Sequence, residues 1–249
     1  MRSALPAVGV LTAGLAVGIV LAACRSGQAP TDAASARGTA EVVHLRGLAF
    51  TLPDDESIAW WQRAPSLARL ATYAKGGSDV SVGGVSRRMP AAAVSAGFFS
   101  VLGIRIIQGR DFEPADDHRE PIGSAIVRRT FWKQLGAKDE AIGRAELTVG
   151  GRRYQIVGIA PDADLFPRDV DVWIAAPFGS PGFQVLQAPR GAWVARPKPG
   201  ATMADVESDL YAALASLNTR YAGQGRSFGD TIQVQPLDAE TGLASRPAP

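Results

Sequence analysis

The sequence predicts an α+β domain that follows an apolar N-terminal helix. Residues 146–159 alternate apolar and polar side chains around Gly150 and Gly151, which is typical of a β-hairpin. Residues 202–221 repeat apolar side chains at helical spacing between two strand-like segments. Ala4 to Ala23 contains no charged residue, which predicts the N-terminal helix. With 46% hydrophobic and 20% charged residues, the 249-residue chain has the composition of a folded protein.

The N-terminal run predicts either export or membrane insertion. Its twenty apolar residues would span about 30 Å as a helix, enough to cross a bilayer, so residues 1–24 fit both a signal peptide and a transmembrane anchor. The run ends in Leu-Ala-Ala-Cys at residues 21–24, which resembles the lipobox of bacterial lipoproteins. Cys24 is the only cysteine and falls where that pattern places the acylated residue, so we predict it as a lipid attachment site. The alternative is a transmembrane helix in which Cys24 has no role.

Three further regions follow the N-terminal segment. Residues 25–40 are small, polar and proline-containing, which predicts a flexible tether. Residues 41–237 contain no second apolar run of membrane-spanning length and form the predicted extracytoplasmic body. Residues 238–249 are small and proline-rich, which predicts a disordered tail.

The first half of the body predicts short elements separated by glycine and proline. A strand is expected within residues 41–50, followed by a helix that Asp54 and Asp55 would cap. After Pro65 we expect a short turn containing Leu67 and Leu70. The remaining predictions are a hairpin-like stretch through the glycines at 76, 77, 83 and 84, a short helix capped by Ser95 and ended by Gly103, and a strand-like segment over 104–109.

The second half predicts three strands, a hairpin and the clearest helix. Residues 124–127 and 170–175 read as strands, residues 130–135 as a short helix ended by Gly136, and 177–189 as a boundary rich in proline and glycine. Thr202 and Asp205 form a variant of the capping box at the start of the last helix, and Gly223 ends it. The strands before and after this helix can lie parallel, with the helix covering one face of a sheet. Its predicted buried face is Met203, Val206, Leu210, Leu214, Leu217 and Tyr221.

No pattern of catalytic, cofactor-binding or metal-binding residues stands out. A net charge of +2 argues against nucleic acid as a partner, and one cysteine allows no internal disulfide. The chain has neither a GxSxG nucleophile motif nor a GxxxxGK[ST] phosphate loop, and His44 and His118 lack a second histidine at ligand spacing. We interpret two acidic clusters as solvated polar loops: Asp116, Asp117 and Glu120, and Asp162, Asp164, Asp169 and Asp171. The arginine pairs 87–88, 128–129 and 152–153 are interpreted as surface charges that flank strands.

The order of several segments resembles MacB-like periplasmic core domains. AVSAGFFSVLGIRIIQGRDFEPADD resembles the segment in which a short Phe-Phe helix leads into GxxxxxGRxF and an acidic loop. AIVRRTFWKQLGAKDEAIGRAELTVGGRRYQIVGIAPD is similar to the family's strand, Phe-Trp helix and glycine hairpin. DVWIAAPF and ARPKPGATMADVESDLYAALASLNTRY match the following strand, turn and amphipathic helix, so the resemblance covers about residues 54–237.

This resemblance implies a two-part body and a mechanical function. The implied architecture is a porter-like subdomain built from both ends of the domain, with a smaller mixed α/β subdomain inserted at about residues 111–187. In this family the domain lies between the first two transmembrane helices of FtsX-like permeases of ABC transporters, dimerises, contacts periplasmic partners and brings no catalytic residues. We therefore expect a non-enzymatic interaction module in the cell envelope, attached to the membrane on its extracytoplasmic side and accessory to an export system. Its expected partners are the membrane, an ABC transporter permease, ATPase or periplasmic adaptor, and a second copy of the chain.

Two other functions remain open from the sequence. The chain ends where a permease would enter its second transmembrane helix, so a truncated exporter permease, anchored by its first helix, is the main alternative. An envelope hydrolase would use loop carboxylates such as Asp116 or Asp162 as catalysts.

Overall fold

The computed structural model describes residues 42–46, 63–136, 138–163, 165–176, 180–186, 192–224 and 231–237. All of them belong to one unit, Thr39–Pro249. The predicted N-terminal helix, the tether, the helix after Asp54 and the tail lie outside the described residues. Among the described residues, no helix combines the length and the apolar character needed to span a membrane.

The longest element is a β-hairpin formed by strands β2 (Leu67–Val82) and β3 (Val85–Val94). Gly83 and Gly84 connect the strands with φ values of 57° and 84°, which glycine adopts without steric cost. The predicted turn at Leu67 and Leu70 was wrong, because both residues lie in β2 and pair with strand β9 (Ala192–Pro197). Gly76 and Gly77 lie inside the same strand, opposite Ala91 and Pro90.

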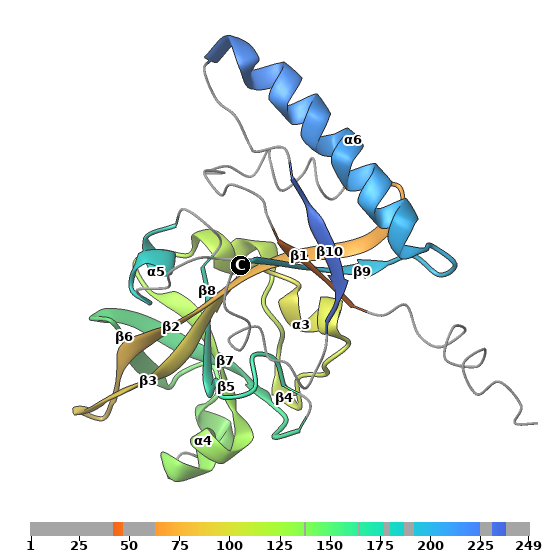
Figure 1. The fold of residues 1–249 in the computed structure, drawn as a ribbon. Helices are drawn as coiled ribbons and strands as arrows, with labels where there is room; N and C mark the ends of the chain where they lie inside the picture. The colour runs from red at the N-terminus through yellow and green to blue at the C-terminus, as the bar shows by residue number, and fades with distance from the viewer. Residues whose placement is uncertain are drawn as a thin grey trace, which may run out of the picture. The chain divides into compact units, whose positions relative to one another are not determined.

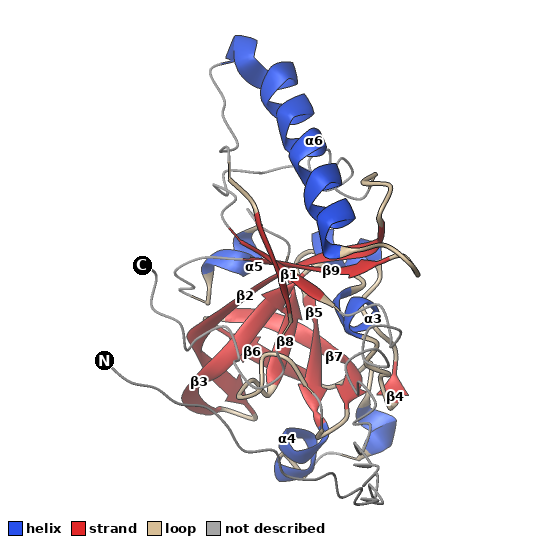
Figure 2. Ribbon diagram, turned by 45° about the vertical axis from the view of Figure 1, so that its right-hand side comes forward, coloured by secondary structure: helices blue, strands red, loops and turns tan. Residues whose placement is uncertain are grey.

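The strands form one mixed sheet, drawn in Figures 1 and 2. It begins with β10 (Gln233–Pro236) and β1 (Val43–Arg46), and its full order is β10-β1-β9-β2-β3-β8-β5-β7-β4. Strand β6 (Glu146–Val149) lies off this path and pairs with β2 and with β7 (Arg152–Ala160). The pairs β3–β8 and β5–β7 are parallel, with β8 at Val172–Ala175 and β5 at Gly123–Arg128. The other pairs, including β4 (Gln108–Gly109) with β7, are antiparallel, so the protein has the predicted α+β class.

Segments from the beginning and from the end of the described chain meet at one edge of this sheet. Strand β1 (Val43–Arg46) lies between β9 and β10 (Gln233–Pro236) and is antiparallel to both. Strands β9 and β10 are therefore parallel to each other, as the sequence predicts, although β1 separates them. The strands of the expected inserted region, residues 111–187, join the same sheet through β8 and β6. The boundary of that region stays a prediction.

Helix α6 (Met203–Tyr221) begins with the predicted capping box and buries most of the predicted face. The Thr202 hydroxyl accepts a hydrogen bond from the Asp205 N–H at 3.2 Å, and the Asp205 carboxylate accepts from the Thr202 N–H at 2.8 Å. Figure 1 shows α6 beside the edge of the sheet that is formed by β10, β1 and β9. Met203 was predicted on the buried face but is 37% exposed, since it occupies the first turn. The buried face contains Val206, Leu210, Leu214, Leu217 and Tyr221, which pack with Trp193, Ala195 and Leu45.

The rest of the core covers both faces of the sheet, and side chains along β3 alternate between the faces. Along β3, Ala91 and Ala93 belong to one cluster while Ala92 and Val94 belong to the other. Helix α3 (Phe98–Leu102) packs on the second cluster, and helix α4 (Arg129–Gln134) contributes Phe131 and Trp132 to the first. Alternation of this kind follows from the two-residue period of a strand buried on both faces.

Three further local predictions have a mixed outcome. The hairpin at residues 146–160 is confirmed, with Gly150 and Gly151 at φ values of 56° and 82°. Ser95 was wrongly predicted to cap α3, because Gly97 holds the N-cap position and the Ser95 Oγ accepts a hydrogen bond from the Thr72 N–H at 2.9 Å. The predicted strand over 104–109 is reduced to β4, because only its last residues pair with β7.

Candidate functional site

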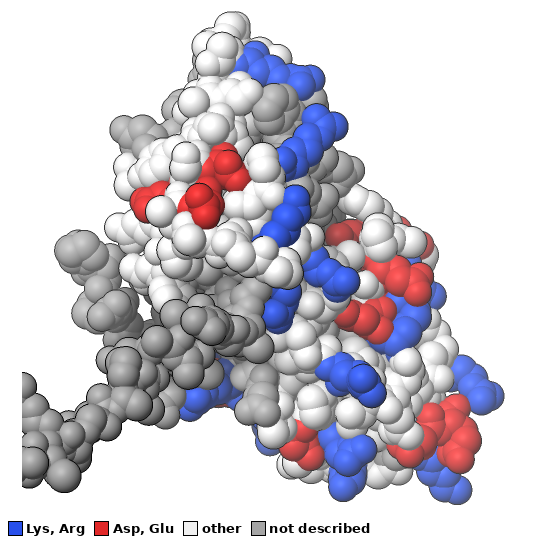
Figure 3. Space-filling model, turned by 90° about the vertical axis from the view of Figure 1, so that its right-hand side faces the viewer, with Lys and Arg blue, Asp and Glu red and all other residues white. Residues whose placement is uncertain are grey.

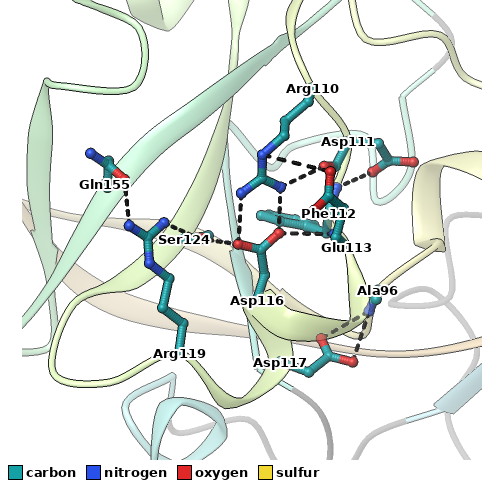
Figure 4. Close-up of polar contacts among 10 residues, drawn as sticks. All are labelled: Ala96, Arg110, Asp111, Phe112, Glu113, Asp116, Asp117, Arg119, Ser124 and Gln155. Atoms are coloured by element: carbon teal, nitrogen blue, oxygen red, sulfur yellow. Dashed lines mark hydrogen bonds and ion pairs between the residues drawn. The ribbon is translucent and has the colours of Figure 1, made fainter.

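A network of charged and polar side chains joins residues 110–119 to strands β5 and β7 (Figure 4). Asp116 lies in the short helix η1 (Pro114–His118), and Arg110 follows strand β4 directly. The guanidinium of Arg110 donates through Nη1 and Nη2 to the two Asp116 carboxylate oxygens, at 2.5 and 2.9 Å. The Glu113 N–H donates to Asp116 at 2.8 Å, and the Ser124 hydroxyl at 2.5 Å. The Asp116 carboxylate therefore accepts four hydrogen bonds, although the residue is only 3% exposed.

These contacts fix the ionisation of both partners. Burial alone would raise the pKa of Asp116, but the hydrogen bonds from Arg110, the Glu113 N–H and Ser124 outweigh it and lower the pKa to about 2. The hydrogen bond to Asp116 raises the pKa of Arg110. Nearby, burial raises the pKa of Asp111, against the lowering effect of hydrogen bonds from the Phe112 and Ser100 backbone. Asp116 and Arg110 are therefore a permanently charged pair at neutral pH.

The interpretation of the first acidic cluster as a solvated loop was wrong for Asp116, because its carboxylate is buried against Arg110. Both carboxylate oxygens of Asp117 accept from the Ala96 N–H, at 2.9 and 3.2 Å, and so bind η1 to the start of α3. Glu120 is exposed and forms an ion pair with Arg152. Arg119 extends the network by donating to Ser124 at 3.3 Å and to Gln155 at 2.8 Å.

The second acidic cluster is divided among separate structural contacts. Asp162 accepts from the Thr130 N–H at 2.8 Å and so caps helix α4 from outside the helix. Asp169 pairs with Lys75, and Asp171 lies 2.8 Å from the Nε of Arg128. Asp164 lies outside the described residues. The carboxylates of Asp162, Asp169 and Asp171 therefore have separate partners and do not converge on one point.

Arg128 differs from the predicted surface arginine. Its Nη1 donates to the Asp162 carbonyl at 3.0 Å, and its Nη2 donates to the Val170 carbonyl at 2.8 Å. The side chain is only 15% exposed, so Arg128 holds the loop before β8 against the end of β5. By contrast, Arg153 lies 3.7 Å from Glu146 with 60% of its side chain exposed, and Arg88 is 58% exposed beside Asp79, as expected for surface charges.

The two histidines occupy different environments. His44 is 2% exposed in β1, and its Nε2 lies 3.4 Å from the Tyr73 hydroxyl. His118 is exposed at the end of η1. Within the described ranges, no group of three His, Cys, Asp or Glu side chains is arranged to hold a metal ion. Cys24, the predicted lipid attachment site, lies outside those ranges.

The geometry of these networks suits structural support better than acid–base chemistry. A general acid or base needs a reachable proton and a pKa near the working pH. Asp116 has neither, since it is enclosed by its four donors and its pKa is about 2. Asp162 is exposed but uses an oxygen to cap α4.

Sequence reasoning missed Arg110 and Ser124, which complete the buried network. One signal was present, because Arg110 belongs to the GRDF segment quoted for the family resemblance, and the acidic loop follows it directly. Ser124 had no such signal. It reaches Asp116 only because β5 passes beside η1 in the folded chain.

Comparison with known proteins identifies a family and a fold. The sequence profile of the MacB-like periplasmic core domain matches residues 7–213. No curated protein matches the chain.

Three solved structures share the fold at low sequence identity. The periplasmic region of MacB from Actinobacillus actinomycetemcomitans has a TM-score of 0.56 and 12% identity over 85% of this chain and 94% of its own. The extracellular domain of the noncanonic ABC-type transporter YknZ from Gram-positive bacteria has a TM-score of 0.52 and 13% identity over 78% and 99%. A domain of a putative permease protein from Porphyromonas gingivalis has a TM-score of 0.54 and 14% identity over 80% and 90%.

Proposed function

Because the chain belongs to the MacB-like periplasmic core domain family, we propose that it is a non-enzymatic, extracytoplasmic interaction module that assists an export system. The family relates it to the periplasmic domains of ABC transporter permeases. In the proposed arrangement, residues 41–237 form the body that meets a permease, its ATPase partner or a periplasmic adaptor, or a second copy of the chain. Residues 25–40 connect this body to the membrane, and residues 238–249 form a tail.

One structural observation carries the proposal of membrane attachment. The described chain enters and leaves the sheet at the same place, since Val43 pairs with Pro236 in the β1–β10 register. The Leu237 N–H donates to the Val42 carbonyl at 2.7 Å, which extends this pairing to the last described residue. Because the first and last described residues emerge side by side, a membrane anchor on the N-terminal segment would face this part of the sheet.

The polar networks support a role without catalysis. Asp116, the most deeply buried carboxylate among the described residues, is held by four hydrogen bonds, and Asp162 is used for helix capping. A rigid body of this kind suits the binding and transmission of movement. A hydrolase function would be supported only if Asp116→Asn or Asp162→Asn abolished a hydrolytic activity while the protein stayed folded.

Two anchors are consistent with the sequence. In the first, cleavage before Cys24 and acylation of its thiol attach the chain to the bilayer, since each buried CH₂ contributes about 0.8 kcal/mol. In the second, the apolar run remains as a membrane helix, as in a permease subunit. The family match begins at residue 7, inside that run, which favours this second candidate as an alternative.

Palmitate labelling with cell fractionation distinguishes the two anchors. Cells would express the full chain or Cys24→Ala with radiolabelled palmitate, with Ser26→Ala as the matched control outside the lipobox. Lipid anchoring predicts label on the parent and on Ser26→Ala, and no label on Cys24→Ala. An unlabelled parent that stays in the membrane pellet would establish the transmembrane candidate instead.

Site-specific crosslinking tests the interaction function. A photo-reactive amino acid at Val85, which is 76% exposed at the tip of the β2–β3 hairpin, would sample one surface of the body. A second probe at Tyr211, which is 38% exposed on α6, would sample another. We expect at least one position to give a discrete product that contains a permease, an adaptor or a second copy. Only diffuse products at both positions would count against the proposal.

A further inference from the structure

Basic side chains gather around the end of the β2–β9 pair. Arg69 and Arg196 are register partners on these antiparallel strands. Like charges placed directly opposite each other in a sheet are unfavourable, so this pairing is not explained by sheet stability. Lys198 follows β9 directly, and its N–H donates to the Ser66 carbonyl at 2.8 Å. Arg63 lies four residues before β2 and is exposed.

Helix α3 brings a further cation to the same area. The Arg196 Nε donates to the Val101 carbonyl at 2.7 Å, which joins β9 to the end of α3. Arg105 is exposed and lies two residues beyond Gly103, the residue that ends this helix. We call Arg63, Arg69, Arg105, Arg196 and Lys198 the basic end. Figure 3 views the molecule from the side on which β9 ends and β2 begins, and it shows Lys and Arg side chains in a column that runs down this face, with Asp and Glu side chains on either side of it.

Acidic groups lie beside the basic end, because Asp205, Glu207 and Asp209 stand in the first two turns of α6. Asp111 interacts electrostatically with Arg69, but its carboxylate also accepts from the Phe112 N–H at 2.7 Å. Asp209 accepts from the Ser66 N–H at 2.7 Å. In the described part of the chain, Arg63, Arg69, Arg105 and Lys198 form no ion pair. Arg63, Arg69, Arg105 and Lys198 are exposed, so their positive charges face solvent.

The basic end coincides with the place where the chain enters the body. Val43 pairs with Ala195, the neighbour of Arg196, and Pro236 pairs with Val43 on the other side. The predicted tether of roughly 16 residues would span about 20–25 Å as a flexible chain. If the N-terminal segment is in the membrane, the basic end is therefore held within a few screening lengths of the lipid headgroups, each screening length being about 8 Å at physiological salt.

We propose that the basic end docks the body on the surface of a membrane rich in anionic phospholipid headgroups. This inference rests on the proposed membrane attachment and adds an orientation to it. Guanidinium groups suit phosphate because they donate two hydrogen bonds to it, and cations near an anionic leaflet each contribute about a five-fold gain in binding. Docking would stand the β2–β3 hairpin away from the bilayer. Strand β2 alone has 16 residues, about 50 Å in extended form.

The test measures the distance of two labelled positions from lipid headgroups in the full chain. In a Cys24→Ser background, a fluorophore is attached at Ala204→Cys, in the first turn of α6 beside the basic end, or at Val85→Cys, at the far hairpin tip. The chain is inserted through residues 4–23 into vesicles that carry headgroup quenchers. The vesicles contain phosphatidylcholine alone or with about 30% phosphatidylglycerol, and flotation measures attachment separately.

Docking predicts strong quenching at position 204, but not at position 85, in phosphatidylglycerol vesicles only. It predicts loss of this quenching in 0.5 M NaCl and in the triple variant Arg63→Gln, Arg69→Gln, Lys198→Gln. Removing three cations should weaken the docked state on the order of 100-fold. The matched control Arg129→Gln, Lys133→Gln, Lys138→Gln changes the same number of cations on or near α4 and should retain the quenching.

Several outcomes would overturn the proposal. Equal quenching at both positions, equal quenching without phosphatidylglycerol, or equal loss in both triple variants would each do so. Inorganic phosphate that releases the body more effectively than NaCl of the same ionic strength would assign the basic end to a soluble anion. Failure to float with phosphatidylcholine vesicles would refute membrane attachment, whereas salt-sensitive flotation with phosphatidylglycerol vesicles alone would still support the basic end.

Discussion

Arg110 and Asp116 form a two-point ion pair, in which both terminal guanidinium nitrogens donate to both carboxylate oxygens at 2.5 and 2.9 Å. This geometry fixes the orientation of both side chains. Because Asp116 also accepts from Ser124 and from the Glu113 N–H, the pair connects strand β5 to the chain that follows β4. Replacing Asp116 would leave the Ser124 hydroxyl, the Glu113 N–H and the charged Arg110 side chain without their acceptor.

Asp116→Asn is therefore expected to lower the free energy of unfolding by about 3 kcal/mol, because a buried ion pair is broken while Arg110 stays charged. Urea denaturation followed by tryptophan fluorescence measures the change. Glu113→Gln is the matched control, since Glu113 lies 4.0 Å from Arg110 with 64% of its side chain exposed, and it should change stability by less than about 0.5 kcal/mol. Similar losses in the two variants would contradict the structural role of Asp116.

The same pair predicts a pH dependence of stability. The pKa of Asp116 is about 2 in the folded protein, against an ordinary value of 3.8, so ionised Asp116 stabilises the folded state above pH 4. As the pH falls from 4 to 2, about 2 kcal/mol of stability should be lost. Asp111 acts in the opposite direction, because its raised pKa favours protonation in the folded state.

The stability difference between the parent and Asp116→Asn isolates the contribution of Asp116 from other titrating groups. We expect this difference to be constant between pH 5 and 7 and to shrink below pH 4. A difference that stays unchanged down to pH 2 would show that the carboxylate is not held ionised by its donors.

Gly123 pairs with Tyr154 in the parallel β5–β7 register, and its backbone lies against the tyrosine ring. A Cβ added at position 123 would lie 2.6 Å from two ring carbons, so Gly123→Ala should cost about 1–3 kcal/mol in unfolding free energy. Gly223→Ala provides the control, because nothing lies within 4 Å of a Cβ there. Thermal unfolding should show a lower melting temperature for Gly123→Ala only. Partial recovery in Gly123→Ala combined with Tyr154→Val would confirm the ring as the cause.

Thr202→Ala tests the start of helix α6. The Thr202 side chain accepts from the Asp205 N–H, and its loss should reduce stability by about 1 kcal/mol. Ser208→Ala, an exposed substitution inside the same helix, should be neutral or slightly stabilising because alanine favours helix. Urea denaturation of both variants provides the comparison, and equal behaviour would argue against the capping box.

Local pattern predicted some elements well and failed for others in a consistent way. The hairpin around Gly150 and Gly151 and the helix after Thr202 were predictable, because turn glycines and a capping box act within a few residues. Strand β2 was not, because its first residues read as a turn until β9 pairs with them. The role of Ser95 was missed for the same reason, because its hydroxyl accepts a hydrogen bond from the N–H of Thr72, which lies in strand β2.

The sequence by itself determined the α+β class, the apolar N-terminal segment and the buried stripe of α6, because composition, hydrophobic period and capping are properties of neighbouring residues. Tertiary structure alone decided that Asp116 is a buried, permanently ionised partner of Arg110 and not a solvated loop residue. It also decided that Arg69 and Arg196 lie side by side at the place where the chain enters the sheet. Such contacts join residues far apart in the chain, and electrostatic energy depends on their distance and burial, which only the folded chain fixes.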